Sequence, residues 1–179
     1  MLRRATVTLD QLRVMASPVR ARIIATVLAT GDVSIAQIAA HIDRRPDSLY
    51  HHIRLMCQVS LLESAGYRVS GRNREAIYRA GADRFEIDRA NNQPDYIEAA
   101  QRLMRQHASE AVDQLTAAFD SNFPRDLLFF ETINVRLNRE QQENFRSDIA
   151  ELMSRYKAES REESEHVTAL MLLSPVVRP

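Results

Sequence analysis

Two short helices joined by a tight turn are the feature of this sequence that most constrains its fold. Ser34 followed three residues later by Gln37 is a capping box, in which each side chain satisfies a free backbone amide of the other residue. It predicts a helix over 35–41. Pro46 predicts a second helix over 46–58, because proline fits the first turn of a helix and not its interior. The sequence therefore predicts a helix-turn-helix arrangement.

The second of these helices has two contrasting faces. Apolar residues at three- and four-residue steps predict a buried stripe of Leu49, Ile53 and Met56, joined by His52 and Leu55. The opposite face is polar, aromatic and cationic, which suits the edges of base pairs and their flanking phosphates. An ordinary amphipathic surface helix has the same spacing. The neighbouring segments are therefore needed to distinguish a DNA-contacting helix from an ordinary surface helix. The residues of that face are Asp47, Ser48, Tyr50, His51 and Arg54, with Arg45 just before them.

Two further helices are predicted ahead of this pair. Thr8 begins a short one, and Ser17 before Pro18 predicts an N-capped helix over 18–28. Gly31 supplies the left-handed residue with which helices often end. The helix-turn-helix is thus expected to sit inside a larger helical domain.

A hairpin is predicted directly after the helices. The run 61–69 reads as a strand interrupted at Gly66, residues 70–73 as a turn, and 74–79 as a second strand. An arginine at a hairpin tip can lie along a phosphate or enter a minor groove. The alternative is a tip that only keeps the protein in solution. The segment 67–79 is therefore expected to be a cationic wing that carries Arg68, Arg72 and Arg74.

The charge of the chain is divided unevenly between its halves. Residues 1–80 contain twelve Arg and no Lys against six Asp and Glu, a net charge of +6, and residues 81–179 carry −6. A basic half favours a polyanionic partner, because binding releases counterions from the polyanion. The alternative is a solvated surface whose charges are lopsided by chance.

A series of short motifs follows one another in order through residues 9–80. They are Met15-Ala16-Ser17-Pro18-Val19-Arg20-Ala21-Arg22-Ile23-Ile24, Ser34-Ile35-Ala36-Gln37-Ile38-Ala39, Ser48-Leu49-Tyr50-His51-His52-Ile53-Arg54-Leu55, Leu61-Leu62-Glu63, and Gly71-Arg72 with Tyr78. Together they resemble the winged helix-turn-helix of the ArsR-like transcriptional regulators. The resemblance implies a DNA-binding regulator that is usually a homodimer, with the 46–58 helix in the major groove and the 67–79 wing on the backbone or in the minor groove.

The sequence departs from the metal-sensing members of that family. Those members carry a cysteine pair in the helix before the turn, or Asp and His clusters near a C-terminal dimer helix, whereas residues 35–41 contain no cysteine. The single cysteine, Cys57, is expected to face the core beside Met56, although a redox role is an alternative. We therefore expect the non-metal-sensing branch, with no metal and no cofactor. One cysteine, no apolar run of membrane-spanning length and no signal-peptide pattern predict a cytoplasmic protein.

The second half predicts a small α+β domain. A linker over 81–93 leads into a helix over 94–119, a strand over 127–137, a helix capped by Asn138, and a last strand over 166–175. The expected fold is mainly α with a small β component: a winged helix-turn-helix over 1–80 and a helix-strand-helix-strand dimerisation domain over 94–179.

The second half is also expected to hold the partners other than DNA. Both of its helices have more apolar face than one small layer needs, which predicts a homodimer, with a monomer as the alternative. A small-molecule effector is a further prediction, because His107 and several aromatic residues are able to line a pocket, although packed core residues are the commoner outcome. These aromatic residues are Tyr96, Phe119, Phe123, Phe129, Phe130 and Tyr156.

We therefore predict a sequence-specific DNA-binding regulator. The alternatives are a protein-interaction module or an RNA-binding module on the same fold. An enzyme is not expected, because no Gly-rich phosphate loop, nucleophile elbow or multi-ligand metal spacing is present. The residues expected to attract phosphates are Arg20, Arg22, Arg44, Arg68, Arg72 and Arg74. Those expected to read bases are Arg45, Asp47, Ser48, Tyr50, His51 and Arg54.

Overall fold

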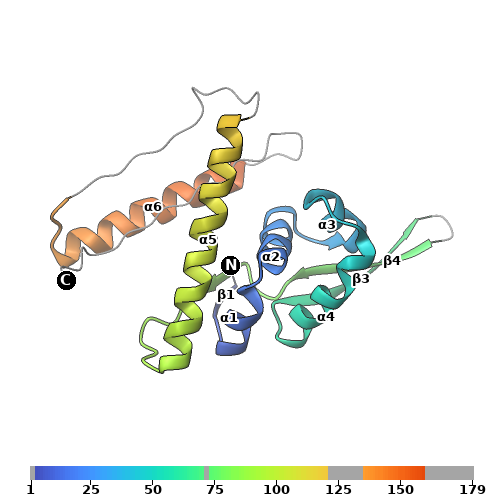
Figure 1. Ribbon diagram of the computed structural model, residues 1–179, viewed down its shortest axis with the longest axis horizontal. Coiled ribbons are helices and arrows are strands. Elements are labelled where there is room, and N and C mark those ends of the chain that lie inside the picture. The colour runs from blue at the N-terminus through green and yellow to red at the C-terminus, as the bar shows by residue number, and fades with distance from the viewer. Residues whose placement is uncertain (1–2, 71–72, 121–134, 160–179) are drawn as a thin grey trace. The chain divides into compact units, whose positions relative to one another are not determined.

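The chain divides into two units, which are described separately below. The computed structural model describes residues 3–70, 73–120 and 135–159 (Figure 1). The first unit is Met1–Ala108 and the second is Ser109–Pro179. Among the described residues, no helix has both the length and the apolar composition needed to cross a membrane.

Four α-helices form the first part of the first unit, close to their predicted positions. They are α1 (Leu9–Met15), α2 (Pro18–Thr30), α3 (Ile35–His41) and α4 (Tyr50–Gln58). The predicted capping box of α3 is present: the Ser34 hydroxyl accepts from the Gln37 amide at 3.2 Å, and the Gln37 side chain accepts from the Ser34 amide at 3.0 Å. Thr8 and Gln11 form the same pair of bonds at the start of α1. Local side chains thus set where these two helices begin.

Helix α2 has the predicted bounds at its start but not the predicted capping bond. Ser17 stands at the N-cap with an extended backbone, yet its hydroxyl makes no capping hydrogen bond. Proline at the first position of α2 already fixes the backbone there and needs no partner for an N–H. At the other end Gly31 has φ 83°, so the predicted glycine stop is confirmed.

The segment 46–58 begins differently from its prediction. Residues Pro46–Ser48 form a 3-10 turn, η1, and the α-helix starts only at Tyr50. The Ser48 amide donates to the Arg45 carbonyl at 3.1 Å and the Leu49 amide donates to the Pro46 carbonyl at 2.9 Å. These three-residue bonds tighten the first turn, and the α-helical pattern takes over with the Ile53 amide on the Leu49 carbonyl.

A three-stranded antiparallel sheet combines a short strand before α3 with two strands after α4. Its strands are β2 (Val33–Ser34), β3 (Leu62–Ser70) and β4 (Asn73–Ala80), in the order β2-β4-β3. The register of β3 against β4 shifts between Ser64 and Gly66, and Gly66 has φ 101°. The predicted interruption is therefore a β-bulge. In Figure 1 the hairpin of β3 and β4 extends beyond α3 and α4. Helices α3 and α4 followed by this hairpin make up a winged helix-turn-helix fold.

Two short strands that the sequence did not predict close the first unit. Strand β1 (Arg4–Thr6) pairs in parallel with β5 (Arg84–Glu86), and the Val7 amide extends the pairing to the Glu86 carbonyl at 2.9 Å. The segment 81–93, predicted to be a linker, thus contains an ordered strand. A three-residue strand has too few side chains to show the alternation typical of strands. Neither β1 nor β5 could therefore be predicted from its own sequence.

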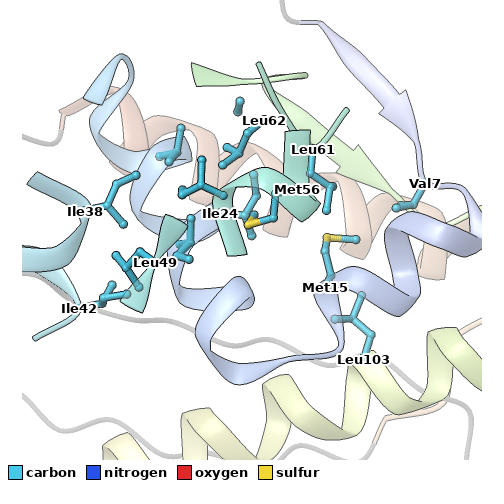
Figure 2. Close-up of a cluster of buried hydrophobic side chains, with 14 of the residues drawn as sticks. Val7, Met15, Ile24, Ile38, Ile42, Leu49, Met56, Leu61, Leu62 and Leu103 are labelled. Atoms are coloured by element: carbon cyan, nitrogen blue, oxygen red, sulfur yellow. The ribbon is translucent and has the colours of Figure 1, made fainter. Parts of the chain in front are cut away.

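The core of the first unit extends further along the chain than predicted. Buried side chains from α1, α2, α3, α4 and the sheet form one cluster, in which Figure 2 shows Met15, Leu49, Met56 and Leu61. Helix α5 (Pro94–Asp120) adds Leu103 to the same cluster. Its other buried contributions are Tyr96, Ala99 and Ala100. The division between the units therefore lies within α5, whereas the predicted boundaries were at 80 and 94.

Tyr96 fastens the start of α5 to the first unit. Its side chain is 3% exposed, and its hydroxyl donates to the Val7 carbonyl at 2.9 Å. The same oxygen accepts from the Asp88 amide at 2.8 Å. One buried hydroxyl thus connects the residue after β1, the segment after β5 and the first turn of α5.

The predicted apolar stripe of α5 is only partly buried, and its large side chains at one edge are exposed. Large side chains recur along it at seven- and eight-residue steps and are exposed: Ile97, Met104, Val112 and Phe119. His107, predicted to be packed on this stripe, is exposed as well. The prediction for His107 was wrong because the core takes only the face of α5 that carries Tyr96 and Leu103.

Helix α6 (Arg139–Glu159) is the second helix described in the second unit. The predicted cap is present, since the Asn138 side chain accepts from the Gln141 amide and the Gln141 side chain accepts from the Asn138 amide, both at 2.9 Å. The predicted strand over 166–175 lies outside the described residues, as does most of the one predicted over 127–137.

Candidate nucleic-acid interface

The outward face of η1 and α4 carries the side chains that the sequence assigned to base reading. Asp47, Ser48, Tyr50, His51 and Arg54 are all exposed, and so is Arg45 before them. The inward side chains, Leu49, Ile53 and Met56, are at most 2% exposed. Core packing therefore fixes how this helix is rotated and leaves its polar face open.

Two contacts on this face hold side chains in place. The Ser48 hydroxyl donates to the Arg45 carbonyl at 2.7 Å, so that its oxygen stays available as an acceptor. One Arg54 nitrogen, Nη2, lies 3.4 Å from the His51 Nδ1. Because residues three apart lie on one helix face, His51 helps to orient the guanidinium of Arg54.

His52 differs from its neighbours in being half-buried. Its Nδ1 is shielded from solvent and has no hydrogen-bond partner in the described part of the chain. Burial lowers the pKa of His52, and the positive charges of Arg20, His51 and Arg44 lower it further. Two of these groups are arginines, Arg20 from α2 and Arg44 from the turn, so both elements contribute positive charge near His52.

The two predicted arginines of α2 are placed differently. Arg22 is exposed on the surface of the helix. Arg20 is half-buried, its Nε donates to the Val14 carbonyl at the end of α1, and burial lowers its pKa. Arg20 therefore also joins α1 to α2, in addition to adding charge to this surface.

The wing holds its arginines by contacts on both of its faces. Arg68 donates from Nη1 to the Gln37 Oε1 at 3.4 Å, which links β3 to α3. On the other face the Arg74 guanidinium stacks over the Tyr67 ring at 3.8 Å from the ring centroid. Arg72, the remaining predicted wing arginine, lies outside the described residues.

Ion pairing separates the arginines of residues 1–80 into two groups. Four of them bind carboxylates: Arg3 to Glu63 at 3.3 Å, Arg4 to Glu86 at 4.0 Å, Arg13 to Asp95 at 3.3 Å and Arg79 to Asp32 at 2.9 Å. None of the predicted site arginines that the structure describes forms an ion pair with a described carboxylate. These are Arg20, Arg22, Arg44, Arg45, Arg54, Arg68 and Arg74. The uncompensated positive charge therefore lies on α2, the turn, α4 and the wing.

A shallow depression lies between α4 and the base of the wing. Tyr78 of β4 borders it together with Tyr50, Arg54 and Cys57. Burial raises the pKa of Tyr78, as do the nearby Cys57, Tyr50 and Tyr67. Burial likewise raises the pKa of Cys57, so its thiol stays protonated near neutral pH.

The described residues contain no group of three or more His, Cys, Asp or Glu side chains that could hold a metal ion. Three of the six aromatic residues proposed for an effector pocket lie among the described residues. Tyr96 belongs to the core of the first unit, while Phe119 and Tyr156 are exposed on α5 and α6. Phe123, Phe129 and Phe130 lie outside the described residues.

Two residues of this surface were missed from the sequence. Gln37 was assigned only to the capping box, but its side-chain oxygen also meets Arg68. Tyr67 was taken only as part of a strand, but it carries the Arg74 guanidinium. The strand register was the signal that could have found Tyr67, since a diagonal pair across a hairpin shares one face.

Comparisons with known proteins give matches only among solved structures. No family model and no curated protein matches the chain. A transcriptional regulator homologue from Pyrococcus horikoshii OT3 is 20% identical over 60% of this chain and 92% of its own, with a TM-score of 0.36. A possible transcriptional regulator for arsenical resistance is 23% identical over 64% of this chain and 99% of its own, with a TM-score of 0.34. YusO from Bacillus subtilis is 10% identical over 81% of this chain and 79% of its own, with a TM-score of 0.35.

Proposed function

We propose that this protein is a DNA-binding transcriptional regulator of the ArsR-like, non-metal-sensing kind, in which α4 enters the major groove of duplex DNA. The observation that carries the proposal is the separation of the arginines by ion pairing. An arginine that already binds a carboxylate gains little from a phosphate, whereas an unpaired exposed one attracts it. Within residues 1–80, the described arginines without an ion pair lie on α2, the helix-turn-helix and the wing.

Each element has a role in the proposed complex. The exposed face of α4 presents Arg54 for hydrogen bonds to guanine, and Tyr50 and His51 for neighbouring base edges. Arg45, just before η1, is expected to read a base as well. Arg22 and Arg44 are expected to bind phosphates, as is Arg20 through the donors that Val14 leaves free. The wing then follows the backbone or the minor groove with Arg68, Arg72 and Arg74.

A homodimer is part of the proposal. The exposed apolar residues of α5 recur at seven- and eight-residue steps, which is the spacing that lets two helices pack along a seam. A second copy would cover Ile97, Met104, Val112 and Phe119. Two copies of α4 about 34–36 Å apart would then read the two halves of a palindromic site. An effector remains a prediction without an assigned pocket among the described residues.

The experiment starts from duplexes selected by the full chain out of a random pool at physiological salt. Arg54→Ala should weaken binding to a selected duplex by about 1–3 kcal/mol, because a bidentate contact to a base or phosphate is lost. Arg13→Ala is the matched control. It removes the same charge from an arginine that is paired with Asp95, and it should leave the affinity nearly unchanged. Equal losses in the two variants would contradict the proposal, and a selected site without two-fold symmetry would contradict the dimer.

The alternative is an RNA-binding or protein-interaction module on the same fold. An RNA duplex has a deep, narrow major groove that an α-helix cannot enter. A chain that reads bases with α4 should therefore prefer the DNA duplex over the RNA duplex of the same sequence at matched salt. Equal affinity for both would favour the alternative.

A further inference from the structure

The stacked pair of Tyr67 and Arg74 lies on one face of the wing, next to its tip. Tyr67 pairs with Ala76 across the hairpin, so that Arg74 is the diagonal neighbour of Tyr67, two residues nearer the tip. Diagonal side chains in an antiparallel hairpin share a face and can touch when they are long or aromatic. The guanidinium carbon of Arg74 lies 3.8 Å from the Tyr67 ring centroid, which is a cation–π contact.

The opposite face of the wing is fixed separately. Arg68 pairs in register with Glu75 on that face, and its guanidinium reaches the Gln37 side chain on α3 at 3.4 Å. Gln37 is itself held by the Ser34 amide through the capping box. Arg68 and Arg74, which the sequence treats alike, therefore have different contacts. Arg68 meets α3, whereas the described contact of Arg74 is with Tyr67 of the same hairpin.

We propose that Tyr67 is a positioning residue for DNA binding, which holds the Arg74 guanidinium ready for a phosphate of the duplex, while Arg68 anchors the wing to α3. This inference rests on the proposed function. Stacking uses the flat face of the guanidinium and leaves the N–H donors at its edge free for a phosphate. A flexible arginine loses rotamer freedom when it binds, and a stacked one has lost part of it beforehand.

The surroundings of the pair support a ligand outside the protein. Arg74 is exposed and forms no ion pair with a described carboxylate, and Tyr67 is 59% exposed despite its contact. The same face of β4 continues to Tyr78, which borders the depression beside Tyr50 and Arg54 of α4. A duplex that lies on α4 would therefore meet Arg74 on the face of the wing that continues from that depression.

The test is a double-mutant cycle on a selected duplex with the full chain. Tyr67→Leu should weaken binding about two- to fivefold, the worth of an exposed cation–π contact, whereas Tyr67→Phe should bind like the wild type. Arg74→Ala should reduce the slope of log K against log salt by about 0.9, because one phosphate contact is lost. The double variant Tyr67→Leu with Arg74→Ala should bind no more weakly than Arg74→Ala alone.

Tyr50 provides the matched control, because it is exposed to the same 59% and no arginine among the described residues stacks over it. The effects of Tyr50→Leu and Arg74→Ala should add. Additive effects of Tyr67→Leu and Arg74→Ala in a chain that binds the duplex would overturn the role of Tyr67. Absence of duplex binding by the wild type would overturn the proposed function, and with it the positioning role.

A second readout needs no DNA. In the free protein the Tyr67 ring current should shift the Arg74 side-chain NMR signals upfield. Tyr67→Leu should abolish this shift, Tyr67→Phe should keep it, and Arg68→Ala should leave it unchanged. Arg74 signals at ordinary positions in the wild type would overturn the proposed preorganisation even if the duplex is bound.

Discussion

Replacing Tyr96 by phenylalanine should destabilise the first unit by about 1–3 kcal/mol. The substitution keeps the buried ring and removes only the hydroxyl, which makes two hydrogen bonds, at 2.9 Å to the Val7 carbonyl and at 2.8 Å from the Asp88 amide. Each such hydrogen bond contributes about 0.5–1.5 kcal/mol net to stability. The substitution removes both bonds at once, one from the Val7 carbonyl and one from the Asp88 amide. The loss is therefore a sizeable part of the 5–15 kcal/mol by which domains are usually stable.

The assay is urea unfolding of the full chain followed by circular dichroism. Tyr96→Phe should lower the midpoint with an unchanged slope, because the folded surface stays the same. Tyr156→Phe is the control, since Tyr156 is 62% exposed and its loss of a hydroxyl should leave the midpoint in place. An unchanged midpoint for Tyr96→Phe, or equal shifts in both variants, would refute the assignment of the start of α5 to the first unit.

Two further predictions concern the first unit. Gly81→Ala should cost about 1–3 kcal/mol or more, because its new Cβ would lie 2.2 Å from the Ser60 carbonyl oxygen, and an unchanged urea midpoint would show that this backbone yields freely. His52→Gln should flatten the pH dependence of stability below pH 6.5, the ordinary pKa of histidine. The sign follows from the lowered pKa of His52: between its folded pKa and 6.5 the unfolded chain holds more protons, so stability falls as the pH falls, and a wild-type curve parallel to that of His52→Gln would contradict this.

Where one segment carries its own signal, the sequence predicted the fold closely. The capping boxes of α3 and α6 rest on residues three apart, and both are present. The rotation of α4 followed from the spacing of Leu49, Ile53 and Met56. The first residue of α4 was harder to predict, because Pro46 is compatible with a 3-10 turn and with an α-helix alike.

Features that depend on distant partners could not be predicted in the same way. Strands β1 and β5 are three residues long and pair across most of the first unit. The place of Tyr96 in the core depends on Val7 and Asp88, which only the folded chain brings to it. The predicted domain boundaries followed local sequence signals over 81–94, whereas the core of the first unit continues into α5.

In the candidate site too, features set by local sequence could be predicted, and those set by contacts between segments could not. Residue type and helix spacing were enough to select the exposed side chains of α4. They were not enough to distinguish Arg68, which reaches α3, from Arg74, which stacks on Tyr67. That distinction needs the register of β3 against β4, which places Arg74 diagonally to Tyr67 and Arg68 on the opposite face.

The measurement that tests the central claim most directly is the salt dependence of duplex binding in two triple variants of equal charge. One replaces Arg44, Arg54 and Arg74 by alanine, and the other replaces Arg4, Arg13 and Arg79, which bind carboxylates. If the unpaired arginines face the DNA, the first variant should lose about 2–3 from the slope of log K against log salt, and the second should keep the wild-type slope. Equal slopes in both variants would show that net charge alone, and not this surface, attracts the duplex.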